Sequence, residues 1–321
     1  MSKVAVIGAG IAGLAFAHRL AELDQASEIS IFEAGPRAGG SIETEQRDGF
    51  ILEKGPDSFI SEKPWGLELA KRLGLESEII GTENENRRSL VLRNGRLLAV
   101  PQGFYLMAPT EIKQFLRSPL FSPAGKLRMM MEPLIPAKRD GGDESVAGFI
   151  RRRFGQECLE RAGQPMLAGI YTGDPERLSM LATMPRFIEL EKKHKSVIRG
   201  LMGELPESSG PRYSLFLSFR HGMETLVKAI LSRIPEGALR LNTTVKATRY
   251  EPREKHWNVL LADGRTELFD RVVLALPAYG AAALISEESP SLFTLLSAIY
   301  FGAAVEDHHH EKPDLEKQAI V

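Results

Sequence analysis

The chain has 321 residues, of which 43% are hydrophobic and 26% charged, and its formal net charge is −1 at pH 7. That length and apolar content can fill the cores of two compact domains. The near-zero net charge predicts no general attraction for nucleic acid, although it does not exclude contact with a membrane surface. The single cysteine, Cys158, rules out an intramolecular disulfide and favours the reducing cytoplasm. We expect no secretory signal, and no apolar run has the length of a membrane span.

The first element is an apolar strand over residues 3–7 that leads into a glycine turn. Gly8, Gly10 and Gly13 form the pattern G-x-G-x-x-G, and apolar residues 14–17 continue it as a helix. Strand, glycine turn and helix in this order are typical of dinucleotide binding, because the turn and the helix N-terminus offer N–H groups to a pyrophosphate. The predicted cradle comprises Gly8, Ala9, Gly10, Ile11, Ala12 and Gly13.

A second apolar strand, residues 28–32, ends at an acidic side chain. Glu33 follows it, twenty residues after Gly13. An acid at this place accepts hydrogen bonds from a ribose hydroxyl and argues against a 2′-phosphate. Gly39 and Gly40 come next and suit a second close approach of the backbone to the cofactor. The sequence therefore predicts a nucleotide site.

The following elements alternate between short strands and helices. Residues 49–59 predict a strand that ends in a turn, and residues 64–74 predict a helix that stops at a glycine. Residues 89–100 predict a hairpin around Asn-Gly. Asp143 is the expected cap of a helix that ends at residue 154. Residues 185–201 have apolar side chains at helical spacing.

After a helix over residues 223–234, the apolar period changes to two, which predicts strands at 239–250, 256–261 and 268–276. The last of these is apolar enough to return as a buried strand to the first sheet. We therefore predict an α/β (α+β) chain. Its Rossmann-like nucleotide domain is discontinuous, and a mostly helical domain is inserted into it: the expected parts are residues 1–83 plus 236–280, and 84–235.

The C-terminal residues differ in composition from the rest. Residues 306–321 are mostly charged, so we expect disorder there. Three adjacent histidines, residues 308–310, cannot easily converge on one ion, and we predict no metal site. Residues 281–305 are expected to begin a further segment that stays incomplete.

The pattern G-x-G-x-x-G, acid, Gly-Gly resembles the flavoprotein oxidases that include amine oxidases and phytoene desaturases. Further stretches resemble the bacterial protoporphyrinogen/coproporphyrinogen oxidases within that group. These stretches are residues 53–59 (EKGPDSF), 143–146, 167–174 (LAGIYTGD) and 222–226.

The resemblance implies a FAD-dependent oxidase of a porphyrinogen in haem biosynthesis, with O2 as acceptor and hand-over to other enzymes of the pathway. Ala34, Gly55, Pro56, Asp57 and Ser58 would line the FAD, and Val245 would offer backbone contacts to the adenine. Gly169 and Tyr171 would face the substrate. The family's reaction moves a hydride to the flavin, and no general base is assigned here.

Two departures from the family pattern affect these expectations. Tyr105 stands where eukaryotic-type relatives place an arginine near a substrate propionate, which resembles the coproporphyrinogen-using branch. The glycine-rich segment that closes over the flavin is not found in residues 277–321, so the chain is expected to be truncated. Two other interpretations stay open: an amine or carotenoid oxidoreductase, and a non-catalytic fragment that binds flavin or porphyrin. For residues 151–153, three arginines, a solvated helix face is favoured over an anion clamp.

Overall fold

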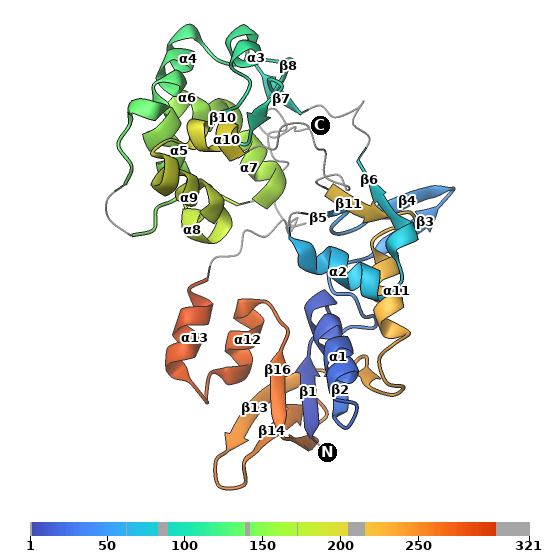
Figure 1. Ribbon diagram of the computed structural model, residues 1–321. Coiled ribbons are helices and arrows are strands. Elements are labelled where there is room, and N and C mark those ends of the chain that lie inside the picture. The colour runs from blue at the N-terminus through green and yellow to red at the C-terminus, as the bar shows by residue number, and fades with distance from the viewer. Residues whose placement is uncertain are drawn as a thin grey trace. The chain divides into compact units, whose positions relative to one another are not determined.

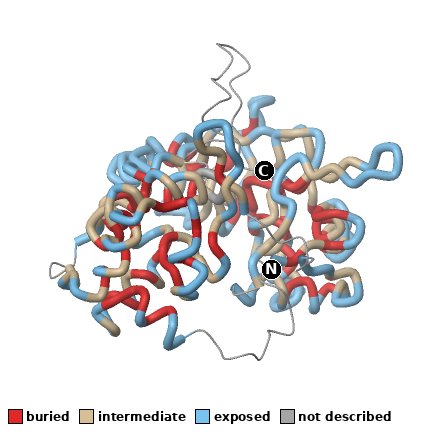
Figure 2. Tube along the Cα trace, turned by 90° about the horizontal axis from the view of Figure 1, so that it is seen from above, coloured by how far each residue is buried: buried red, intermediate tan, exposed pale blue. Residues whose placement is uncertain are grey.

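The computed structural model describes residues 2–61, 63–82, 89–138, 142–171, 173–204 and 216–299. The expected tail at 306–321 and residues 300–305 lie outside these ranges. The described residues divide into two compact units: those of unit 1 lie within 1–83 and 210–299, and those of unit 2 lie within 84–209. Both contain helices and strands, and each has its own apolar core (Figures 1 and 2).

Unit 1 is built on a four-stranded parallel sheet with the order β12-β2-β1-β16. Its members are β1 (Lys3–Ile7), β2 (Glu28–Phe32), β12 (Leu239–Arg240) and β16 (Arg271–Leu274). Helix α1 (Ile11–Leu23) follows β1 and packs against β1 and β2. Residues 4–7 are buried, as in parallel strands covered on both faces. The strand, turn, helix and second strand thus confirm the predicted order.

The two predicted strands at 239–250 and 268–276 are each divided between two sheets. The chain turns at Asn242, where φ is +51°, so β12 joins the parallel sheet while β13 (Val245–Glu251) joins an antiparallel one. A second break falls at Asp270, and β16 then returns to the first sheet beside β1, as predicted. The antiparallel sheet contains β13, β14 (His256–Leu261) and β15 (Thr266–Phe269).

The boundary between the units differs from the expected one. Strand β11 (Phe216–Phe219) pairs with two strands of unit 1, and α11 (Glu224–Leu231) packs against α1. Burial of Leu217 and Phe219 draws this segment into unit 1, whereas we expected the insertion to continue to residue 235. The remaining elements of unit 1 are β3 (Thr44–Arg47), β4 (Phe50–Glu53), β5 (Phe59–Ile60), α2 (Pro64–Arg72), η1 (Glu76–Glu78), β6 (Ile79–Gly81), α12 (Ala278–Ile285) and α13 (Pro290–Ser297).

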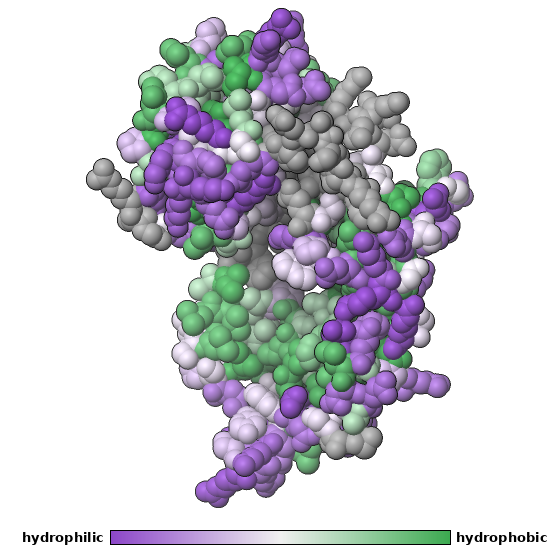
Figure 3. Space-filling view, in the orientation of Figure 1, coloured by the Kyte–Doolittle hydropathy of each residue, from purple (hydrophilic) through white to green (hydrophobic). Residues whose placement is uncertain are grey.

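The end of unit 1 is a helical pair with an apolar surface. Helices α12 and α13 pack together where the start of a further segment was expected, and residues 290–297 are helical. Apolar side chains lie on the surface of this pair (Figure 3); the exposed ones are Tyr279, Leu292, Phe293 and Leu295, and Ile299 follows just after α13. Within the described ranges, no helix is both long and apolar enough to cross a bilayer.

Unit 2 is mostly helical. Its elements are β7 (Leu90–Arg93), β8 (Arg96–Ala99), β9 (Phe104–Tyr105), β10 (Ala108–Pro109), α3 (Ile112–Arg117), α4 (Pro123–Met130), η3 (Glu132–Leu134), α5 (Val146–Phe154), α6 (Gln156–Cys158), η4 (Leu159–Gly163), α7 (Gln164–Tyr171), α8 (Met180–Thr183), α9 (Pro185–His194) and α10 (Val197–Glu204). The predicted helix at 185–201 is interrupted at Lys195, whose φ is +58°. Ser145 caps α5, whereas the predicted cap, Asp143, accepts a hydrogen bond from Leu181 N (3.0 Å).

His18 is a buried titratable group on the inner face of α1. Only 3% of it is exposed, and its Nδ1, 3.8 Å from Glu22 Oε2, makes no hydrogen bond with the described residues. Burial lowers the pKa of His18. Glu22 opposes this effect, and Arg72, Arg233 and Arg19 add to it.

We expect the urea concentration at the midpoint of unfolding to decrease when the pH is lowered from about 7.5 to about 5.5, because the unfolded chain binds a proton at His18 more readily than the folded chain does. The stabilisation is complete above the ordinary histidine pKa of about 6.5 and is lost as the pH falls toward the folded value. The variant His18→Phe removes the titrating group and should flatten this part of the profile. If the urea midpoint changes with pH by the same amount in wild type and in His18→Phe, the pH dependence does not come from His18.

Candidate functional site

Two positions of the glycine turn after β1 allow only glycine. Gly8 has a φ of +102°, and a Cβ there would come within 2.5 Å of Ala275 O. A Cβ on Gly13 would overlap Gly8 O. At Gly10, by contrast, the nearest atom to an added Cβ is 4.0 Å away, so the backbone is open on that side. An open glycine before a helix N-terminus fits a pyrophosphate.

The second glycine loop lies directly against the first. Gly39 N donates to Ala9 O (2.8 Å), and a Cβ on Gly40 would lie 3.0 Å from Gly10 Cα. Both Gly39 and Gly40 have positive φ. Arg37 holds this loop: its guanidinium donates to Ala38 O, Gly40 O and Ile42 O and pairs with Glu43. Arg37 was not predicted to have a role, and the glycines around it are the signal that could have indicated one.

Glu33 lies at the end of β2 and beside the glycine turn. Its carboxylate accepts hydrogen bonds from Ala9 N (3.0 Å) and Gly35 N (2.8 Å). Two carboxylate oxygens have about four acceptor sites, so capacity remains for a ribose hydroxyl. The backbone of residues 242–243 bonds to Glu33 and Gly35, which brings the start of β13, Val245, to the same end of the sheet, and Ala34 lies between them.

Residues 55–58 follow β4, and the first of them lies against the second glycine loop. A Cβ on Gly55 would overlap Ser41 O, so this residue runs against the loop that contains Gly39 and Gly40. Ser58 Oγ donates to Asp57, and Ser218 Oγ donates to Asp57 O (2.7 Å). Pro56 lies within the same stretch. The cofactor residues named from the sequence are thus all in unit 1, and Glu33, Gly39, Gly40 and Gly55 contact the glycine turn or the loop beside it.

The two proposed substrate residues lie in unit 2, on α7. The hydroxyl of Tyr171 donates to Thr183 O (3.0 Å), and its ring packs on the core of unit 2. Burial raises the pKa of the Tyr171 phenol, and the interaction with Tyr105 raises it to a smaller extent. Gly169 is in the same helix.

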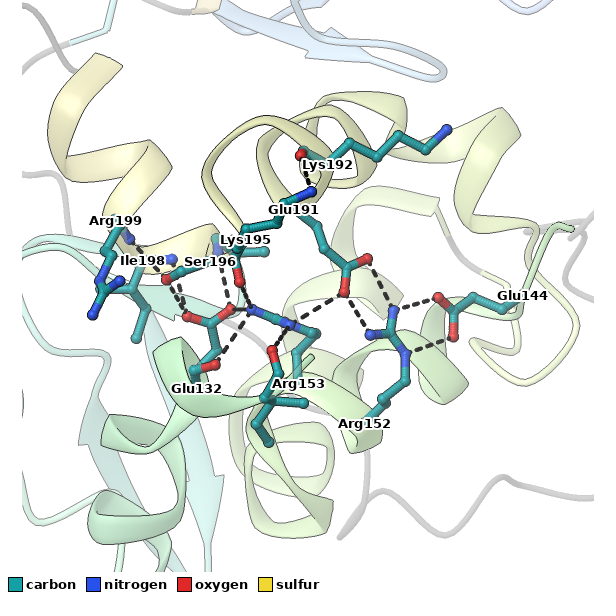
Figure 4. Close-up of polar contacts among 12 residues, drawn as sticks. Glu132, Glu144, Arg152, Arg153, Glu191, Lys192, Lys195, Ser196, Ile198 and Arg199 are labelled. Carbon is teal, nitrogen blue, oxygen red and sulfur yellow. Dashed lines mark hydrogen bonds and ion pairs between the residues drawn. The ribbon is translucent and has the colours of Figure 1, made fainter. Parts of the chain in front are cut away.

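A buried ionic cluster lies elsewhere in unit 2 (Figure 4). Arg153 is fully buried and pairs with Glu132 and, at 3.2 Å, with Glu191. Arg152 bridges Glu191 (2.5 Å) and Glu144 (2.6 Å). The solvated face favoured from the sequence is therefore wrong for these two arginines. The acidic partners lie too far along the chain to be recognised as local pairs.

Comparison with known proteins gives consistent matches. A family model described as flavin-containing amine oxidoreductase matches residues 11–306. The coproporphyrinogen III oxidase of Bacillus subtilis is 36% identical over 296 residues, which cover 88% of this chain and 62% of the relative. The mitochondrial protoporphyrinogen oxidase of Nicotiana tabacum is 30% identical over 302 residues, which cover 86% of this chain and 58% of the relative.

Solved structures show the same fold. A protein from Exiguobacterium, provisionally assigned as a protoporphyrinogen oxidase, superposes with a TM-score of 0.77 at 27% identity, over 91% of this chain and 63% of that one. Cyclohexylamine oxidase from Brevibacterium oxydans superposes with a TM-score of 0.63 at 19% identity, over 92% and 63%. The chain spans about three fifths of the length of the curated relatives it matches, 60–62% for the first three.

Proposed function

The chain belongs to the family of flavin-containing amine oxidoreductases, and we propose that it binds FAD at the glycine turns of unit 1 and oxidises a porphyrinogen. The observation that carries the proposal is the gathering of Gly8–Gly13, Glu33 and Gly39–Gly40 around one open turn. The names of the relatives supply the substrate class, and the higher identity to the Bacillus subtilis relative favours coproporphyrinogen III over protoporphyrinogen IX.

Each residue of the site has a proposed task. The N–H groups at residues 8–13 and the N-terminus of α1 would hold the pyrophosphate, and Glu33 would accept from the ribose. Ala34 and residues 55–58 would line the FAD, and Val245 would offer backbone contacts to its adenine.

When bound, the flavin supplies a two-electron acceptor for substrate carbon, with O2 as the final oxidant. The protein's part is then orientation rather than acid–base chemistry. We propose that unit 1 is the discontinuous, Rossmann-like FAD domain and that the mostly helical unit 2 is the substrate domain. Within unit 2, Gly169 and Tyr171 would contact the porphyrinogen. The single buried cysteine agrees with a cytoplasmic setting.

The test begins with the visible spectrum of the purified chain after incubation with FAD. We expect a yellow protein that retains FAD through gel filtration; a colourless protein would overturn the proposal. The loaded protein is then given coproporphyrinogen III, protoporphyrinogen IX or cyclohexylamine, and porphyrin fluorescence and O2 uptake are followed. We expect porphyrin from coproporphyrinogen III. Oxidation of the amine alone would overturn the substrate assignment and leave FAD binding intact.

A further inference from the structure

We propose that Thr44 and Glu53 are positioning residues for the dinucleotide. Both belong to the β3–β4 hairpin, and together they cap α11 and thereby hold the two ends of the hairpin against the glycine turn. The inference rests on the proposed function, because it concerns how a dinucleotide site is kept in shape.

Two hydrogen bonds join the hairpin to the start of α11, and a third links the two hairpin side chains that accept them. Glu53 Oε1 accepts from Met223 N (2.7 Å), and Glu53 Oε2 accepts from Thr44 Oγ1 (2.7 Å). Thr44 Oγ1 in turn accepts from Glu224 N (3.0 Å). The first N–H groups of a helix have no partner within the helix, and no side chain at the start of α11 caps it. The cap is therefore supplied by residues about 170 positions earlier in the chain.

The approach of α11 to the hairpin depends on a glycine. Gly222 has a φ of +91°, and a Cβ there would overlap Thr44 Cγ2 and lie 2.8 Å from Glu53 Oε1. Residue 222 has to lack a side chain for the two hydrogen bonds from α11 to the hairpin to form. The negative carboxylate also lies at the N-terminus of a helix, where the helix dipole favours it.

The hairpin is continuous with both loops that surround the cradle. Before β3 the chain passes through Gly39, whose N bonds to Ala9 O, and after β4 it passes through Gly55 against Ser41. Helix α11 packs against α1, and Val227 of α11 lies 3.5 Å from the place of a Cβ on Gly39. A cap that ties α11 to β3 and β4 therefore fixes both loops relative to the N-terminus of α1. Thr44 and Glu53 act through these loops.

A matched pair of variants at one position tests the role. Thr44→Val keeps the shape and loses the hydroxyl, whereas Thr44→Ser keeps the hydroxyl. The control is Ser145→Ala, which removes a cap of the same kind from α5 in unit 2. FAD affinity is measured by flavin fluorescence. A lost cap typically corresponds to about a fivefold change in an equilibrium, so we expect Thr44→Val to weaken FAD about fivefold to tenfold. We expect Thr44→Ser and Ser145→Ala to stay within about twofold of wild type.

Trypsin cleavage after Arg47, an exposed residue of the hairpin, gives a readout that does not depend on turnover. Without FAD, Thr44→Val should be cut about fivefold faster than Ser145→Ala, since local opening exposes the hairpin. If wild type binds FAD and Thr44→Val binds it equally well, the positioning role is overturned and FAD binding stands. If wild type takes up no FAD, the proposed function itself fails, and this inference falls with it.

Discussion

The variant Gly8→Ala is expected to lose FAD binding and at least about 3 kcal/mol of stability in unit 1. The φ of +102° is unfavourable for any residue with a Cβ, and the added atom would come within 2.5 Å of Ala275 O, a backbone atom that cannot turn away. Relief requires β1 to move from β16, or the turn to open. Either movement also weakens the 2.8 Å hydrogen bond from Gly8 N to Phe32 O.

The matched control for Gly8→Ala is Gly280→Ala in α12, also in unit 1. An added Cβ there meets only ordinary contacts, the nearest at 3.6 Å, and alanine in a helix interior stabilises by roughly 0.5–1 kcal/mol. Urea unfolding and FAD titration on both variants make the comparison. A Gly8→Ala protein with the wild-type midpoint and FAD affinity would contradict the described turn.

The elements around the glycine turn could be predicted because their signals are local. A buried parallel strand is an apolar run and the turn requires glycine, so β1 and β2 have the bounds that the pattern indicates, whereas α1 begins at Ile11, inside the glycine pattern, rather than after it. The Asn94–Gly95 hairpin follows from equally local chemistry, since both residues have the positive φ that this turn needs.

Sheet membership could be predicted for the apolar strand that returns beside β1, but not for the alternating strands, because period-two alternation does not say which strand is the neighbour. Residues 239–250 have one pattern but contribute to two sheets, and the turn at Asn242 is fixed by its hydrogen bond to Gly35 O. The capping residue of a helix is also hard to predict from the local sequence. Ser145 and Asp143 are equally good caps by type, and only the tertiary position of Leu181 N decides that Asp143 bonds elsewhere.

The glycines of the candidate site can be recognised in the sequence, whereas the residues that support them cannot. Arg37 and Thr44 have no distinctive sequence pattern, because their partners are backbone groups or side chains that only the fold brings near. Glu53 belonged to a motif, but the motif did not indicate that this carboxylate caps a helix. Long-range polar contacts of this kind leave no periodic trace in a single sequence.

The three consecutive arginines of α5 allow the stability cost of removing a buried arginine to be compared with that of removing an exposed one. Arg153 is fully buried, and it pairs with Glu132 and Glu191 and donates to the carbonyl of Lys195. Glu132 also accepts hydrogen bonds from Ser196 Oγ and from the first N–H groups of α10. Removal of the arginine leaves the Glu132 carboxylate without its cation in a dry interior, which costs more than the net value of the pair, whereas Glu191 keeps its pair with Arg152.

We therefore expect Arg153→Ala to lower the free energy of unfolding by about 3–5 kcal/mol, whereas Arg151→Ala should cost less than about 1 kcal/mol, because its pair with Glu176 is exposed to solvent. The double variant Arg153→Met/Glu132→Gln should recover part of the loss, since it removes the cation and the carboxylate together. Urea unfolding followed by circular dichroism measures all three. A cost for Arg153→Ala no larger than that for Arg151→Ala would show that the buried cluster is not formed as described.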